Sequence, residues 1–204
     1  MAAHFPSPEL FPAFYILGLF AGSLIRFCFT RGKRKVRSAE NWSSRADPLL
    51  LFLVSVGMLV LPLVYLLTPW LEGFDYALPQ WAGWLGVVLF SSSLWLLWRS
   101  HVDLGSNWSP KLEIGPDQTL VTGGVYSRIR HPMYAAHWLW ALAQPLLLWN
   151  WVAGPAFLVA LLPLYLVRVS REEQMMLSRF GEQYREYMDR TGRIIPSLCS
   201  RGSL

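Results

Sequence analysis

The stretch Pro48–Trp70 reads PLLLFLVSVGMLVLPLVYLLTPW and contains no Asp, Glu, Lys or Arg. An α-helix rises about 1.5 Å per residue, so roughly 20 apolar residues cross the hydrocarbon core of a bilayer. A charge-free run of this length therefore predicts a transmembrane helix. The composition agrees, because 53% of the 204 residues are hydrophobic and only 15% are charged, whereas soluble domains carry about 25% charged residues.

Three other apolar runs flank this one. Leu10–Phe29 carries a single charge, Arg26, near enough to its end for the side chain to reach the interface. Leu78–Trp98 contains no Asp, Glu, Lys or Arg, and neither does Met133–Val167, which is too long for one crossing. The Asn, Gly and Pro residues within 150–155 favour a turn near the middle of this last run. It therefore predicts two short helices.

Together these runs predict an all-α polytopic membrane protein with about five transmembrane helices, in a single domain over residues 1–204. The last two helices are expected to form a hairpin, and an amphipathic cytoplasmic helix follows them. The expected bounds are 10–29, 48–70, 78–98, 133–149 and 151–168 for the crossings and about 170–190 for the cytoplasmic helix.

Clusters of Lys and Arg follow the first, third and fifth predicted crossings. They lie within 31–45, 99–130 and 171–201, whereas the loop 71–77 contains neither residue. Cytoplasmic loops carry the excess of Lys and Arg, so the N-terminus is expected outside and the C-terminus in the cytoplasm. This topology and contact with anionic membrane lipids explain the formal net charge of +5. The charge therefore predicts no nucleic-acid binding.

Two polar segments, 99–133 and 168–204, are expected on the same cytoplasmic face. In the first, the Arg-His-Pro sequence at 130–132 suits the start of a helix, where exposed N–H groups favour an anion. In the second, Arg168 and Glu172 are four residues apart and share a helix face. Alone, each feature is more simply read as interfacial or surface charge. Together they place cationic and anionic groups where both ends of a zwitterionic ligand would find partners.

The motifs in these segments resemble those of a known family. The string GVYSRIRHPMY at 124–134 is followed by Arg-Glu-Glu at 171–173 and by FGEQYREY at 180–187. In this order they resemble the isoprenylcysteine carboxyl methyltransferase family, in particular its short prokaryotic members. The likeness extends over 101–196. It implies a membrane enzyme that uses S-adenosyl-L-methionine and is located in a prokaryotic inner (cytoplasmic) membrane.

The resemblance also implies roles for individual residues around a cytoplasmic cofactor pocket, built from the 99–133 loop and the C-terminal helix. The cofactor-binding residues it implies are Tyr126, Arg130, His131, Tyr134, Glu172 and Glu173. The implied catalytic residues, which hold or polarise the acceptor carboxylate or orient the cofactor, are Arg168, Arg193 and Glu172. The implied substrate-binding residues are Asn107, Trp108, Trp138, Tyr184 and Tyr187. No metal site is expected, because Cys28 and Cys199 show no ligand spacing.

The acceptor is expected to be a lipid-like small molecule, and its methylated group a carboxylate such as that of a prenylcysteine. A carboxylate is already ionised near pH 7, so its methylation needs no general base. Three alternatives remain open. Phospholipid N-methylation would require a base or a desolvated amine. A membrane NADPH-dependent reductase is disfavoured only weakly, by the absence of a Gly-x-Gly-x-x-Gly turn. A non-enzymatic scaffold or transporter subunit fits less well, since transporters usually hold polar groups mid-membrane.

Overall fold

The computed structural model describes residues 10–31, 40–42, 44–107, 113–114 and 118–197. Seven α-helices account for most of this part of the chain: α1 (Leu10–Thr30), α2 (Asp47–Ser55), α3 (Leu61–Leu67), α4 (Gln80–Leu104), α5 (Pro132–Leu147), α6 (Ala156–Phe180) and α7 (Glu182–Arg190). A π-helical turn at Val56–Val60 joins α2 to α3, and short 3-10 turns cover Pro69–Phe74, Gly105–Asn107 and Gly124–Ser127. Two-residue strands, β1 (Glu40–Asn41) and β2 (Glu113–Ile114), pair antiparallel. The predicted all-α class is confirmed, apart from this short pairing.

Three helical segments are long and apolar enough to cross a membrane: Leu10–Thr30, Asp47–Leu67 and Gln80–Leu104. Most of their residues lie on the outside of the protein, and large side chains such as Phe20 and Phe52 are 71% and 62% exposed. Such apolar surface suits contact with lipid chains and would be costly in water. α5 has 16 residues and is about 24 Å long, which is less than the roughly 30 Å hydrocarbon core.

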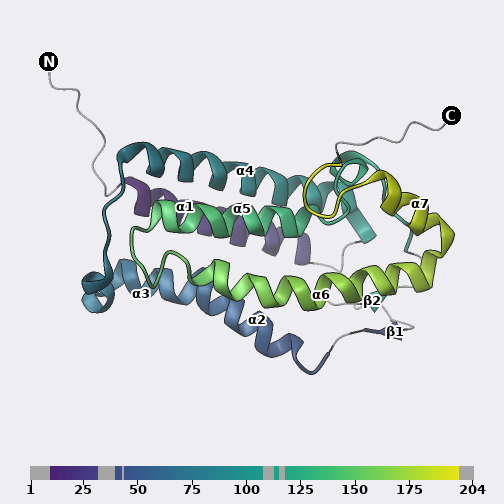
Figure 1. Cartoon of the computed structure of the whole chain (residues 1–204), viewed down its shortest axis with the longest axis horizontal. Helices are drawn as coiled ribbons and strands as arrows, with labels where there is room; N and C mark the ends of the chain where they lie inside the picture. The colour runs from purple at the N-terminus through teal and green to yellow at the C-terminus, as the bar shows by residue number, and fades with distance from the viewer. Residues whose placement is uncertain (1–9, 32–39, 43, 108–112, 115–117, 198–204) are drawn as a thin grey trace, which may run out of the picture.

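The helices form two layers, shown in Figure 1. α1, α4 and α5 pack together in one layer, while α2, α3 and α6 form the other. The main hydrophobic core lies between and within these layers, and includes Phe90, Trp140 and Phe157. The first two rings lie edge to face with centroids 4.8 Å apart.

A buried polar network joins the layers near the π-helical turn. Pro62 has no N–H, so the carbonyl of Met58 lacks its usual helical donor. The Tyr15 hydroxyl oxygen lies 2.8 Å from this carbonyl and 2.9 Å from Gln144 Oε1, so its single proton is shared between the two acceptors. The Gln144 amide in turn donates to the carbonyl of Gly57 at 3.0 Å. The irregular backbone of the second apolar segment is therefore satisfied by side chains of α1 and α5.

The main difference from the predicted helices concerns the C-terminal part. A break was expected near residue 168, followed by a separate cytoplasmic helix over 170–190. This is wrong, because α6 continues without interruption from Ala156 to Phe180. Charged side chains end an apolar run but do not end a helix, and α6 stops only at Gly181, whose φ of 53° favours glycine. The chain then turns and α7 folds back toward the start of α5.

Candidate functional site

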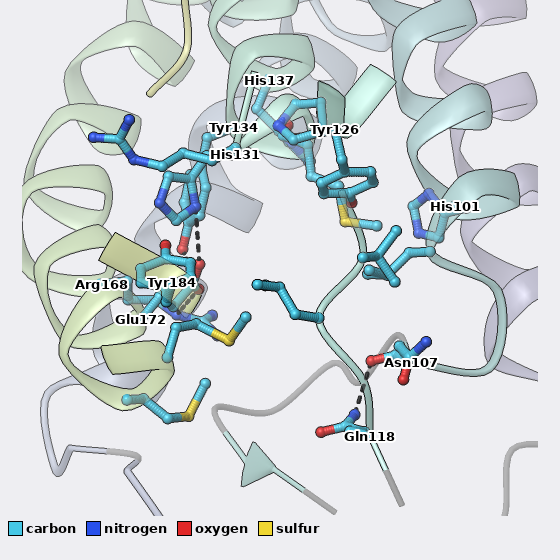
Figure 2. Close-up of a pocket in the computed structure, with 18 of the residues that line it drawn as sticks. His101, Asn107, Gln118, Tyr126, His131, Tyr134, His137, Arg168, Glu172 and Tyr184 are labelled. Carbon is cyan, nitrogen blue, oxygen red and sulfur yellow. Dashed lines mark hydrogen bonds and ion pairs between the residues drawn. The ribbon is translucent and has the colours of Figure 1, made fainter. Parts of the chain in front are cut away.

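A cavity of about 450 Å³ is lined by residues of both layers, from the C-terminal parts of α4 and α6, the start of α5, and α7. This volume is within the range of roughly 300–1,000 Å³ that small-molecule sites occupy. Figure 2 shows His131, Tyr134, Glu172 and Tyr184 on one side of it and His101 and Asn107 on the other. The rest of the wall is largely apolar and includes Leu51, Val54, Leu161, Leu164, Met175 and Met176. The cavity therefore offers both a polar and an apolar surface.

Glu172 is the acid that faces this cavity. The Tyr134 hydroxyl donates to Glu172 Oε1 at 2.7 Å. His131 Nδ1 lies 3.6 Å from Oε2, and Arg168 Nε lies 3.9 Å from Oε1. The side chain of Glu172 keeps 21% of its surface exposed. Its carboxylate therefore has few strong hydrogen bonds and retains room for a further donor.

Glu173 does not line the cavity and is held in a cationic cluster. Arg130 Nε donates to its Oε1 at 2.7 Å, and Arg193 Nε donates to the same oxygen at 3.0 Å. His131 Nε2 is 3.4 Å from it. Burial alone would raise the pKa of Glu173, but these cations outweigh it and lower the pKa to about 2. Glu173 is therefore a buried anion that holds together three cationic side chains.

His131 lies between the two carboxylates. Burial alone would lower its pKa, but contacts with Glu172 and Glu173 outweigh the burial and raise the pKa above its ordinary value. Its Nε2 makes no hydrogen bond to the described residues, and it lies 3.4 Å from Glu173 Oε1 as an ion-pair contact. The imidazolium form is therefore favoured, and it carries positive charge to the wall of the cavity.

The C-terminal segment is fastened to the start of α5 by backbone hydrogen bonds. The N–H groups of Arg130 and His131 donate to the carbonyls of Gly192 and Arg193, both at 2.9 Å. The Tyr187 hydroxyl donates to the carbonyl of Tyr126 at 2.6 Å. These contacts bring the tyrosines of α7 to the wall of the cavity, although they are remote in sequence from the Arg-His-Pro motif.

Nine of the residues predicted for the site line this one cavity. They are Asn107, Tyr126, Arg130, His131, Tyr134, Arg168, Glu172, Tyr184 and Tyr187. Glu173, Arg193 and Trp138 do not line it. Arg193 is engaged with Glu173, and Trp138 packs edge to face on Tyr165 with ring centroids 5.6 Å apart. Trp108 lies outside the described residues.

Sequence reasoning missed several residues of the cavity wall. His101 and His137 are ionisable residues within or at the end of apolar helices, which is a signal of function in membrane proteins. Arg26 was noticed but was interpreted as an interfacial side chain. Among the residues that the structure describes, no group of three or more His, Cys, Asp or Glu could hold a metal ion.

Residues 84–178 match the profile of the isoprenylcysteine carboxyl methyltransferase (ICMT) family. The chain is 36% identical over 96 residues to protein-S-isoprenylcysteine O-methyltransferase of Tribolium castaneum, covering 46% of this chain and 34% of that protein. It is 35% identical over 82 residues to the Schizosaccharomyces pombe protein of the same name, covering 40% and 35% of the two chains.

A solved structure of the eukaryotic intramembrane Ras methyltransferase ICMT is also similar. It has a TM-score of 0.55 and 25% sequence identity, covering 90% of this chain and 62% of that one. The likeness and the three long apolar helices make this chain an integral membrane protein. The matched region covers about a third of the length of the two curated relatives. The family profile spans His131, Arg168 and Glu172, whereas Tyr184 and Tyr187 lie beyond it.

Proposed function

We propose that this chain, which belongs to the isoprenylcysteine carboxyl methyltransferase family, is an S-adenosylmethionine-dependent methyltransferase that acts on the carboxylate of a lipid-like acceptor. The observation that carries the proposal is the single cavity in which Glu172 and Arg168 adjoin an apolar wall. The acid and the cation suit a polar methyl donor and an anionic acceptor, and the apolar wall suits a hydrocarbon chain.

The polar side of the cavity fits the methyl donor. The Glu172 carboxylate accepts one hydrogen bond, from Tyr134, and can accept more from an ammonium group. Cationic His131 beside it suits the carboxylate of the donor's amino-acid part. Tyr126, Tyr184 and Tyr187 supply aromatic surface for a flat base or a sulfonium cation. Glu173 does not line the cavity and acts as a positioning residue for His131.

The apolar side fits a lipid-like acceptor, for example a prenylated small molecule. Leu51 and Val54 of α2 and Leu161 and Leu164 of α6 line it, and the two helices pack against each other. Arg168 lies where this apolar wall meets the polar one, and its Nε is buried without a hydrogen-bond partner. A buried donor without an acceptor costs free energy, so it is suited to binding an anion from a ligand. We assign it to the acceptor carboxylate.

When bound, S-adenosylmethionine supplies a methyl group activated by its sulfonium. The residues of the chain have three tasks in its transfer. Arg168 holds the ionised acceptor carboxylate, which needs no general base near pH 7. Glu172 and His131 fix the position of the donor, so that the two reactants meet in line. The apolar wall excludes water from the reacting charges.

Five crossings and a cytoplasmic site complete the proposal. α5 and α6 add two shorter or charged helices to the three long apolar ones, and the turn at 148–155 joins them. The segments at the cavity end of the bundle are the ones rich in Lys and Arg. This favours the cavity end as the cytoplasmic side. A soluble donor is available there, while an acceptor can arrive through the bilayer. A prokaryotic inner membrane follows from the resemblance to the short members of the family.

Titration calorimetry on the detergent-purified chain tests the proposal. We expect S-adenosylmethionine and its demethylated product to bind and NADPH not to bind. Glu172→Gln and His131→Ala should weaken binding, whereas Glu186→Gln, which changes an exposed acid on α7, should not. NADPH binding without any response to S-adenosylmethionine would instead indicate a reductase.

Transfer of a labelled methyl group then distinguishes the acceptors. Purified protein is supplied with a prenylcysteine in one reaction and with total membrane lipid in another. Label in a base-labile ester of the prenylcysteine is the expected product. Label in an amine headgroup would assign the chain to phospholipid N-methylation, and binding without any transfer would favour a non-enzymatic role.

A further inference from the structure

Arg26 of α1 lines the cavity, although it lies outside the region that matches the family profile. The residue is exposed, and the chain offers it no counter-charge. Among the residues that the structure describes, no carboxylate lies within 4.0 Å of its guanidinium and no side chain bonds to it. The charged side chain that acts on it is another cation, Arg168.

The cavity as a whole has more positive charge than its acids can balance. Glu172 is the single acid among the described residues that line it. Arg130 is already paired with buried Glu173, at 2.7 Å. Glu172 is shared between His131 and Arg168, the latter at 3.9 Å. The charge of Arg26 therefore remains without an anion at the wall of the cavity.

We propose that Arg26 and Arg168 together form an anion subsite that binds the acceptor's carboxylate and rejects its methyl ester. The inference rests on the proposed function, which it deepens by naming how the site distinguishes substrate from product. α1 and α6 belong to opposite layers of the bundle, so the two guanidinium groups reach the cavity from different sides. One carboxylate placed between them relieves the repulsion of both cations.

Because methylation removes the negative charge of the acceptor, this arrangement favours the acid over its methyl ester. The carboxylate oxygen forms a bond to the methyl carbon as the bond from that carbon to sulfur breaks. The acceptor thereby loses its negative charge, and the donor loses its positive charge. The ester leaves the two cations facing each other without an anion between them. The ester has therefore lost the attraction that holds the acid, so it binds more weakly and the next acid can replace it.

The test measures binding of N-acetyl-S-farnesylcysteine and of its methyl ester to the full chain in detergent, by titration calorimetry. The wild type should bind the acid at least about tenfold more tightly than the ester, as expected for a charge-assisted contact. Arg26→Gln should lower acid affinity about tenfold and leave ester affinity unchanged, and Arg26→Lys should retain part of the preference. The matched control is Arg31→Gln, because Arg31 follows α1, stacks on Phe27 and does not line the cavity.

Binding of the demethylated donor product shows that each variant is folded. The proposal is overturned if Arg26→Gln binds the acid as the wild type does, if it loses the acid and the ester equally, or if Arg31→Gln shows the same loss. Methyl transfer by the wild type and by Arg26→Gln is measured in parallel. Selective acid binding through Arg26 without any transfer would overturn the proposed function alone, while transfer that is indifferent to Arg26 would overturn the subsite alone.

Discussion

Glu172 and Glu173 are adjacent acids on α6, yet their carboxylates have opposite surroundings. Glu172 faces the cavity and accepts one hydrogen bond from Tyr134. Glu173 is 4% exposed and is bound by two arginines, with a histidine also in contact. Successive residues of a helix point about 100° apart, so one turn of α6 can serve two purposes. The difference teaches that the acidic pair of this motif combines a ligand-binding acid with a structural one.

The largest effect expected from this comparison is on stability. Glu173→Gln leaves Arg130, Arg193 and His131 without their shared anion, and breaking a buried ion pair costs about 3–5 kcal/mol. For a chain of this size we expect the thermal midpoint in detergent to fall by roughly 10 °C. Glu186→Gln is the control. A midpoint that stays at the wild-type value would mean that Glu173 does not hold the cluster together.

Glu172→Gln should instead act on binding. Its loss removes a charge-assisted contact worth about 2 kcal/mol, so affinity for the demethylated donor product should fall roughly thirtyfold in a calorimetric titration. The thermal midpoint should change less than for Glu173→Gln, since the Glu172 side chain is 21% exposed and accepts a single hydrogen bond, from Tyr134. Tyr134→Phe should weaken binding less, by about fivefold, because it removes a single neutral donor. If Glu172→Gln lowers the midpoint as much as Glu173→Gln, the two acids share one structural role.

A smaller effect should appear in the dependence of stability on pH. The folded-state pKa of His131 is raised, so its protonation stabilises the fold below the unfolded-state pKa of about 6.5. This contribution is lost as pH rises through the folded-state pKa. The wild-type midpoint should therefore decline between pH 6 and 9 more than that of His131→Gln. Equal slopes for the two proteins would show that His131 is neutral between the two acids.

The sequence predicted the elements whose signal is local. The length of the uncharged run Pro48–Trp70 predicted a transmembrane helix, and the structure has an almost continuous helical segment at Asp47–Leu67. The extent of α6 was missed, because the fifth crossing was expected to end at 168 and a separate helix to begin at about 170. Arg168 and the acids after it lie inside α6. They mark only the place where the apolar part of α6 ends, and the helix itself continues to Gly181.

The site divides in the same way. His131 and Tyr134 belong to one short motif and Glu172 to another. All three line the cavity. The position of Arg193 depends on the turn after α7 and on backbone pairing with the start of α5, which no local pattern encodes. For Arg26 the local pattern was itself misleading. A lone charge near a helix end looks like an interfacial residue unless the packing of α1 against α4 and α5 is known.

The smallest effect is expected for Arg193, for which the resemblance implied contact with the acceptor. Its side chain is 48% exposed, lies outside the cavity and donates to Glu173. An exposed partner of an ion pair contributes under about 1 kcal/mol, and Arg130 remains to hold Glu173 after its loss. Arg193→Ala should therefore leave the KM for a prenylcysteine within about twofold of wild type and lower the thermal midpoint only slightly. Arg168→Ala, measured alongside, should raise that KM strongly. A large rise in KM for Arg193→Ala with an intact midpoint would mean that Arg193 reaches the acceptor, and the cluster around Glu173 would then belong to the active site itself.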